Sequence, residues 1–265
     1  MSEPEMSEPV ISQPVLRIDG LTKSFGGVTA VADLSLTVAA GERVGLIGPN
    51  GAGKTTLINL ISGLLLPDRG QIYLANTDIS RSSPQHRWRS GLGRTFQIAS
   101  AYNQLDIGTN VGLAVAQYYR RATWSPLRGL PNSAFDQADD LLATVGLAVD
   151  PKTPVNTLAY GQVKRLELAI ALANRPRLLL LDEPMAGVGR EGDSNLVSLA
   201  SDALFTDDNP LSAMLFTEHD MDVVFGQATR ILVLDQGQLI ADGPPDQIAA
   251  DDRVRAVYLG EAIEP

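Results

Sequence analysis

The stretch GPNGAGKTT, residues 48–56, decides the fold of this chain. It matches G-x-x-x-x-G-K-[ST], a loop whose glycines let successive backbone N–H groups point at phosphate oxygens. An apolar stretch (43–47) precedes it, and a helix-compatible stretch (54–64, which Gly63 does not prevent) follows it. The alternative is a glycine-rich turn with a surface lysine, which this context disfavours. We therefore predict a nucleoside triphosphate site made by Gly48, Pro49, Asn50, Gly51, Ala52, Gly53, Lys54, Thr55 and Thr56.

Two side chains of this loop carry its chemistry. Lys54 would bring a positive charge to the β- and γ-phosphates, and the Thr55 hydroxyl would ligate Mg²⁺. The helix that starts near Lys54 would add the positive end of its dipole. ATP and Mg²⁺ are therefore the expected cofactors.

The second half of the site is predicted at residues 177–183, RLLLLDE. Four leucines in a row are typical of a parallel strand that is buried on both faces. Open α/β sheets bind ligands at the carboxyl ends of their strands. There Asp182 would hold Mg²⁺, directly or through water, and Glu183 would polarise the attacking water. Alone the pattern equally fits a strand with an acidic end; the upstream phosphate loop favours the site.

The two histidines of the chain receive different interpretations. His219 follows an apolar strand (213–217), which should lie beside the strand that carries Glu183. That arrangement would bring the imidazole to the γ-phosphate. His86 lies in a polar helical stretch without an evident partner, so we predict that it is a surface residue.

Strands separated by helices indicate a parallel α/β core. The middle of the chain, about 80–173, is mainly helical and is interpreted as an inserted subdomain. The strand-like stretches are 15–18, 28–38, 43–47, 71–75, 177–181, 213–217 and 230–234, the last followed by a hairpin turn at 236–237 into 238–241.

The composition is that of an ordinary globular chain and excludes several classes of protein. The 265 residues are 44% hydrophobic, and a net charge of −10 disfavours a free-standing nucleic-acid binder. The lack of cysteine excludes disulfide scaffolds, thiolate zinc sites and cysteine nucleophiles. No apolar run approaches the ~18–20 residues that span a bilayer. The acidic, proline-bearing residues 1–14 predict a disordered leader and no secretion signal, so we expect a soluble, cytoplasmic chain.

Taken in order, these residues resemble the ATP-binding subunits of ABC transporters from Val15 almost to the end. Phe25, in LTKSFG (21–26), is similar to the aromatic that stacks on adenine. Gln97, in GRTFQ (93–97), resembles the glutamine that joins Mg²⁺ to the membrane partner. The signature motif corresponds to Leu158, Ala159, Tyr160, Gly161 and Gln162, followed by Arg165.

The resemblance implies a fold and an activity. The fold class is α/β: a P-loop NTPase core with a mainly parallel sheet, an N-terminal antiparallel β subdomain and an inserted helical subdomain. The ABC domain would span 15–265, with the helical subdomain at about 95–173 within a RecA-like core and a C-terminal extension at about 244–265. ATP hydrolysis would use Glu183, His219 and Gln97, and Mg²⁺ would be held by Thr55, Gln97 and Asp182. The signature would act on the ATP of an opposing subunit.

Several features resemble the importers of branched-chain amino acids, urea and amides. They are GLGRTFQ (91–97), the tyrosine in the signature, the segment 116–132 and the ending VYLG (257–260). The implied partners are permease subunits, a second ATP-binding subunit and, indirectly, a periplasmic or extracellular binding protein, with no nucleic acid. The chain would lie peripherally on the cytoplasmic face of the inner membrane. The alternatives are a non-transport ABC ATPase of the DNA repair or translation type, which usually has two cassettes or a coiled coil, and a P-loop kinase.

Two positions depart from the family pattern. Ala159 replaces the signature serine, and Gly189 stands where an aspartate or asparagine is usual. Both positions normally act on the nucleotide of the opposing subunit, so we expect a heterodimer with unequal sites; a homodimer is the alternative. We also expect part of the apolar stretch 98–119 to form a groove for a permease helix, the rest packing within the subdomain.

Overall fold

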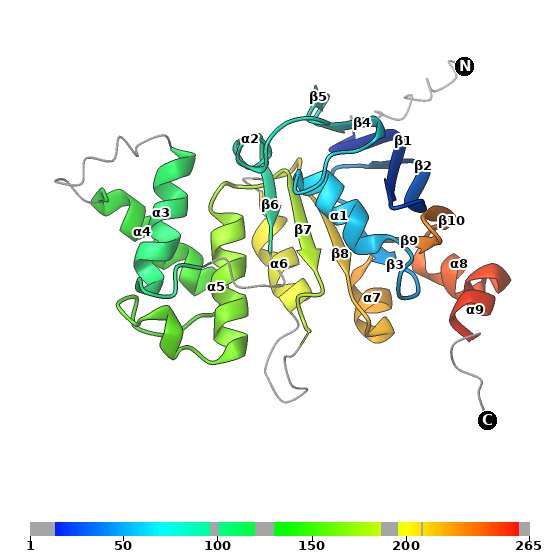
Figure 1. Cartoon of the computed structure of the whole chain (residues 1–265). Coiled ribbons are helices and arrows are strands. Elements are labelled where there is room, and N and C mark those ends of the chain that lie inside the picture. Colours follow the sequence, from blue (N-terminus) through cyan, green and yellow to red (C-terminus); the bar gives the residue numbers. More distant parts are fainter. Residues whose placement is uncertain (1–13, 96–100, 120–129, 187–195, 208, 260–265) are drawn as a thin grey trace, which may run out of the picture.

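The strands of the chain pair into two sheets (Figure 1). The computed structural model describes residues 14–95, 101–119, 130–186, 196–207 and 209–259. An antiparallel sheet has the order β2-β1-β4-β5, with β1 at Leu16–Phe25, β2 at Val28–Val38, β4 at Arg69–Leu74 and β5 at Thr77–Asp78. A second sheet has the order β10-β9-β3-β8-β7-β6, and its strands are parallel except for β10. The strands of this sheet are β3 (Arg43–Ile47), β6 (Leu92–Arg94), β7 (Leu178–Asp182), β8 (Ala213–Thr217), β9 (Arg230–Asp235) and β10 (Gln238–Gly243).

Helices cover the larger sheet and extend beyond both of its edges. Figure 1 shows α3, α4 and α5 gathered beyond β6, with α8 and α9 on the side of β10. The helices are α1 (Lys54–Ser62), α2 (Pro84–Arg89), α3 (Ile107–Tyr118), α4 (Asn132–Thr144), α5 (Tyr160–Leu172), α6 (Leu196–Leu204), α7 (Met221–Gln227), α8 (Pro245–Ala250) and α9 (Asp252–Leu259), with a short 3-10 helix at Val155–Thr157.

The strand β7 is buried on both faces, as its four leucines predicted. Leu178 and Leu180 pack with the antiparallel sheet and α1, whereas Leu179 and Leu181 pack with α5, α6 and α7. Successive side chains of a strand point to opposite faces, so this one strand contributes to two separate cores. The larger sheet is therefore the layer between the two cores.

The fold class predicted from the sequence is confirmed: an α/β chain with one antiparallel and one mainly parallel sheet. The hairpin β9–β10 is also confirmed. Two expectations were wrong in detail. The first helix ends at Ser62 because Gly63 adopts a left-handed φ of 81°, and any Cβ there would meet the Arg87 side chain. Residues 92–94, expected within the helical middle, form the edge strand β6, which pairs with β7.

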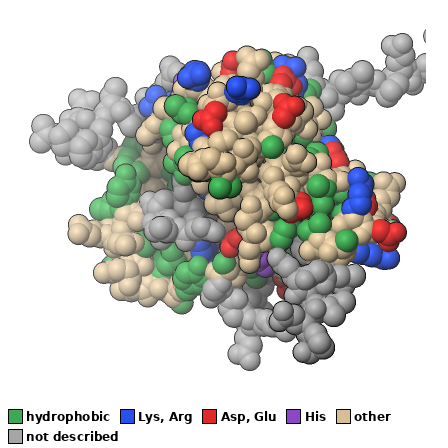
Figure 2. All heavy atoms as spheres, turned by 45° about the vertical axis from the view of Figure 1, so that its right-hand side comes forward, with side chains coloured by type: hydrophobic (Ala, Val, Ile, Leu, Met, Phe, Trp, Pro, Cys, Tyr) green, Lys and Arg blue, Asp and Glu red, His purple; other side chains and the backbone are tan. Residues whose placement is uncertain are grey.

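The described residues contain no helix that is long and apolar enough to cross a membrane. His86 is exposed on α2, as predicted. Figure 2 shows acidic and basic side chains interspersed with hydrophobic ones over the face that carries α8, α9 and the antiparallel sheet. The predicted leader 1–14 falls, except for Pro14, outside the described residues.

Candidate functional site

The phosphate loop joins β3 to α1, and its backbone demands glycine. Gly48 and Gly53 have positive φ angles of 153° and 104°. A Cβ at Gly48 would lie 2.2 Å from the carbonyl oxygen of Leu234, and one at Gly53 would lie 2.2 Å from that of Ala30. No side chain caps the start of α1. The first N–H groups of the helix are therefore available to an anion.

Lys54 holds its charge over this loop. Its Nζ donates to the carbonyl oxygens of Gly48 at 2.5 Å and Pro49 at 3.0 Å, and its side chain is buried. Thr55, the next residue, is exposed. The loop thus combines a cation, a hydroxyl and free backbone donors in one place, which is a donor set suited to phosphate oxygens.

Asp182 ends β7 in a buried position, with partners on both carboxylate oxygens. Oδ2 forms an ion pair with Arg94 at 3.2 Å, and Oδ1 accepts a hydrogen bond from the Thr217 hydroxyl at 3.1 Å. Burial raises the pKa of Asp182, and the Arg94 charge opposes that rise. Arg94, which also donates to Ser62 Oγ, was missed by the sequence reasoning because its role depends on the unexpected pairing of β6 with β7.

Glu183 and His219 meet at the ends of neighbouring strands. The strands β7 and β8 are parallel, with Asp182 opposite Thr217, so the adjacency predicted from the sequence is confirmed. His219 Nε2 lies 2.9 Å from Glu183 Oε1, and the histidine side chain is 60% exposed. A carboxylate and an imidazole are thus in contact where the surface opens to solvent.

Glu218, between Thr217 and His219, is a buried carboxylate that the sequence reasoning did not single out. Its Oε1 accepts a hydrogen bond from the backbone N–H of Met185 at 2.8 Å. Burial raises the pKa of Glu218, opposed by its backbone hydrogen bonds. The sequence did not indicate that Glu218 is buried, because an acidic residue that follows a buried strand more often faces solvent.

The predicted signature residues surround the start of α5. Ala159 is the N-cap residue, and its N–H donates to Gln162 Oε1 at 2.9 Å. Leu158 is half-buried against the hydrophobic core that α5 shares with α3 and α4, and Gly161 has open space around its Cα. The Tyr160 hydroxyl donates to the carbonyl of Ala186 at 2.8 Å. The helix α5 packs on α3, α4, α6 and β6, whereas α1 packs on β2 and β7. The helix that begins at the signature and the helix of the phosphate loop therefore pack mainly on different elements of the chain.

The remaining predicted residues are Phe25 and Gln97. Phe25 is 46% exposed at the tip of the β1–β2 hairpin, beside exposed Val28 with which it pairs. Ala30 of the same hairpin abuts Gly53, so Phe25 lies on the element that borders the phosphate loop. Gln97 lies outside the described residues.

Known proteins match this chain along almost its whole length. Residues 31–186 match the family described as ABC transporter, and residues 238–264 match the family described as branched-chain amino acid ATP-binding cassette transporter. The chain is 36% identical over 254 residues to the high-affinity branched-chain amino acid transport ATP-binding protein LivG of Escherichia coli (strain K12), covering 94% of this chain and 98% of LivG. It is 38% identical over 258 residues to BraF of Pseudomonas aeruginosa, which bears the same description, with the same two coverages. The lipopolysaccharide export ATP-binding protein LptB of Haemophilus influenzae is 34% identical over 250 residues, covering 94% of this chain and 99% of LptB.

Solved structures agree with this result. The ADP conformation of MJ1267, an ATP-binding cassette of an ABC transporter, has a TM-score of 0.76 and 29% identity, covering 94% of this chain and all of that one (100%). A nucleotide-free ATP-binding cassette from an ABC transporter has a TM-score of 0.73 and 27% identity, covering 92% and 98%. The family match covers more than half of the chain, and the curated relatives exceed 30% identity. The chain therefore belongs to the ABC transporter family, as a nucleotide-binding subunit that hydrolyses ATP.

Proposed function

We propose that this chain energises an importer of branched-chain amino acids or of related small polar solutes such as urea and amides. The carrying observation is the match of residues 238–264 to the branched-chain amino acid family, in a region outside the catalytic loops. LivG and BraF support the same substrate class. LptB, to which the chain is also similar, is described as part of an export system, so similarity along the whole chain does not by itself indicate the transported substrate. The match of residues 238–264 is therefore the observation that favours the branched-chain amino acid class.

Reconstitution tests this proposal directly. The chain is purified with its permease subunits, and uptake of leucine, urea and a short amide into vesicles is measured with each candidate binding protein. We expect ATP-dependent uptake of one of these solutes. Purification without any membrane protein would favour the alternative of a DNA repair or translation ATPase, and transfer of phosphate to an acceptor other than water would favour a kinase.

The site supports hydrolysis by charge and by a positioned base. We propose that Lys54 and the free N–H groups of the loop bind the phosphates, while Glu183 takes a proton from the attacking water and His219 contacts the γ-phosphate. The proposed adenine contact is Phe25. When bound, Mg²⁺ would neutralise charge on the phosphates.

The residues fit Mg²⁺ in a particular way. Each Asp182 oxygen has one protein partner and keeps a further acceptor site, so Asp182 would act directly or through a water molecule, and the exposed Thr55 would ligate directly. The described residues contain no cluster of three acidic or histidine side chains for a metal. That is the situation expected when Mg²⁺ takes most of its ligands from phosphate and water. Gln97 is proposed as a further ligand.

We propose that α3 and the residues before it contact the permease. Ile107, Val111 and Val115 are buried within the chain, and Ala101 is 8% exposed, so these four cannot line a groove for a partner. Tyr102, by contrast, is 65% exposed, and Asn103 beside it is also exposed. The docking surface is therefore narrower than the sequence suggested.

Crosslinking checks this surface. The chain has no native cysteine, so a cysteine introduced at Asn103 is unique. We expect Asn103→Cys to crosslink to cysteines in a cytoplasmic loop of the co-expressed permease. A cysteine at exposed Asp136, on α4, is the control that should not react. Absence of any crosslink from both Asn103→Cys and Tyr102→Cys would place the permease elsewhere.

We propose that two ATP-binding subunits face each other, because α5 and α1 pack mainly on different elements and the start of α5 has no side-chain cap. Each chain would then complete the site of the other. Ala159 offers no hydroxyl to the phosphate, and Gly189, outside the described residues, offers no side-chain hydrogen bond. A heterodimer is favoured, in which another cassette supplies an intact signature over Lys54.

Restoring the missing groups tests the unequal sites. One hydrogen bond to a charged group is worth ~1.5–3 kcal/mol, a ten- to hundredfold change in rate. We expect Ala159→Ser with Gly189→Asp to accelerate only the site left working when Glu183 is disabled. The same pair should change nothing when the partner's catalytic glutamate is disabled instead. Equal rates at both sites before restoration would contradict the idea.

The division of the chain follows from the same proposal. The helical subdomain would comprise about 95–173, the C-terminal extension about 244–265, and residues 1–14 would be a leader. The assembly would place the chain on the cytoplasmic face of the inner membrane, attached through its permease partners.

A further inference from the structure

The turn that carries Glu183, residues 183–186, is held in a strained conformation. Glu183 has a φ of 49°, in the left-handed region that residues with a side chain rarely adopt. Such a residue costs about 1–3 kcal/mol and persists only when its surroundings fix it. The contacts around this turn therefore decide where the Glu183 carboxylate lies.

One side of the turn is fixed by Thr217, the last residue of β8, and by Glu218, which follows it. The N–H of Glu183 lies 3.2 Å from the carbonyl oxygen of Thr217 and 3.0 Å from its hydroxyl oxygen. Glu218 then accepts from the N–H of Met185. Two consecutive residues of the β8 end thus hold the first half of the turn, beside His219.

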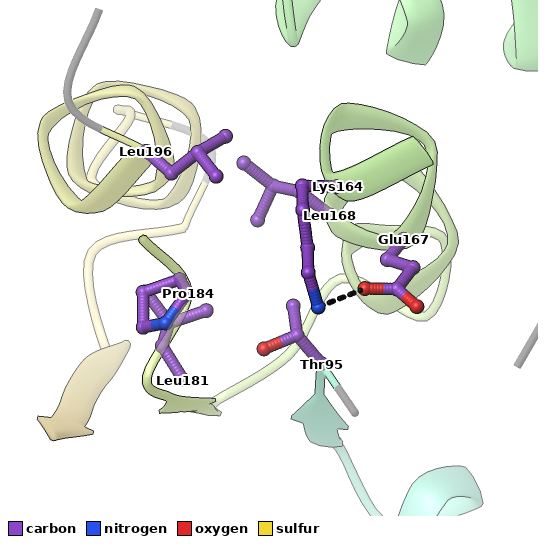
Figure 3. Close-up of a pocket in the computed structure, with 7 residues that line it drawn as sticks. All are labelled: Thr95, Lys164, Glu167, Leu168, Leu181, Pro184 and Leu196. Atoms are coloured by element: carbon purple, nitrogen blue, oxygen red, sulfur yellow. Dashed lines mark hydrogen bonds and ion pairs between the residues drawn. The ribbon is translucent and has the colours of Figure 1, made fainter. Parts of the chain in front are cut away.

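The other side is fixed by α5. The Tyr160 hydroxyl donates to the carbonyl of Ala186 at 2.8 Å, across 26 residues of sequence. One turn further along the helix, Lys164 Nζ lies 5.5 Å from the Tyr160 ring and pairs with Glu167 at 3.1 Å; both charged side chains are buried. Figure 3 shows Lys164 and Pro184 on opposite sides of a cavity of about 10 Å³, which has room for about one water molecule.

We propose that Tyr160 is a positioning residue for Glu183 of its own chain. By fixing the carbonyl of Ala186, it closes the turn from the α5 side and keeps the Glu183 carboxylate against His219. This inference rests on the proposed role of Glu183 in hydrolysis. The signature, which contains Tyr160, is proposed to act on the ATP of the opposing subunit. Positioning Glu183 would be a second role of this motif, within its own chain.

A mechanical link follows from this arrangement. Tyr160 is the first residue of α5, so a displacement of that helix would pull on Ala186 or break the hydrogen bond. Either event would release a turn that is strained at Glu183. The position of the signature helix would thereby control whether the base of the same chain is in place.

Nuclear magnetic resonance of the free chain separates this role from any action on a partner. The chain has only two histidines, and exposed His86 on α2 serves as an internal reference for His219. We expect Tyr160→Phe to move the His219 imidazole resonances toward those of Glu183→Ala, in which the contact is absent. The His86 resonances should stay in place. Tyr73→Phe, which removes a hydroxyl on β4, is the matched control and should move neither.

Kinetics of the assembled transporter provide the second measurement. Loss of one hydrogen bond should lower kcat by about three- to tenfold for Tyr160→Phe, with an unchanged KM for ATP. In a Glu183→Gln background the same substitution should cause no further loss. Unmoved His219 resonances, or an unchanged kcat, would overturn the inference. Full activity of Glu183→Gln would instead overturn the proposed catalytic role, and the resonance measurement would still decide whether Tyr160 positions Glu183.

Discussion

Replacing Glu183 by glutamine should nearly abolish ATP hydrolysis while nucleotide binding survives. The amide has nearly the shape of the carboxylate but cannot take a proton from water. Loss of a positioned general base costs about 10²–10⁴-fold in rate. The phosphate loop joins β3 to α1, whereas Glu183 contacts Thr217 and His219, so the affinity of the loop for nucleotide should be preserved.

Lys54→Ala is the contrasting variant. Removing its charge deletes a direct phosphate contact, so the dissociation constant of ATP should rise about ten- to a hundredfold. Phosphate release and equilibrium nucleotide binding should be measured on both variants. Turnover at the rate of the unaltered protein in Glu183→Gln would show that another group activates the water.

Replacing Arg87 by methionine should strongly destabilise the fold. The Arg87 side chain is fully buried and donates to the carbonyls of Leu60, Ile61, Ser80 and Ser82. Leu60 and Ile61 are in the last turn of α1, where carbonyl groups lack their regular partner four residues on. Besides the bond from Arg87, the Leu60 carbonyl accepts a 3.3 Å hydrogen bond from the N–H of the C-cap residue Gly63. Burial lowers the pKa of Arg87 to about 10, which still leaves the guanidinium charged at neutral pH.

Methionine has a similar length but no donor, so four carbonyls would each lose a partner. Each such buried group costs about 1–3 kcal/mol, and we expect a total loss of about 3–5 kcal/mol after partial relaxation. Urea unfolding of Arg87→Met should be compared with Arg89→Met, an exposed arginine on the same helix that should change the free energy of unfolding by less than about 0.5 kcal/mol. A similarly small loss in Arg87→Met would contradict this account.

The main parts of the site could be predicted because they lie in short, self-contained stretches. The phosphate loop needs its glycines and its lysine at fixed spacing. The adjacency of the strands that carry Glu183 and His219 followed from a rule of topology, since the carboxyl ends of neighbouring parallel strands meet at one edge. The register of β7 with β8, Asp182 opposite Thr217, is what brings the two side chains within 2.9 Å.

Other partners could not be predicted because they are far apart in the sequence and have no pattern of their own. Arg94 reaches Asp182 across 88 residues through the three-residue strand β6. Arg87 looks like one more charge in a polar helix, yet its surroundings bury it completely. Nothing in the signature indicated that the Tyr160 hydroxyl would meet Ala186.

The sequence alone thus determined the fold class, the phosphate loop and the acidic end of β7, because local spacing and hydrophobic periodicity dictate these features. Only the tertiary structure decided how the buried charges are paired and how the turn at Glu183 is held. A buried polar group is stable only with a partner, and which partner it finds depends on how the sheets and helices pack rather than on neighbouring residues.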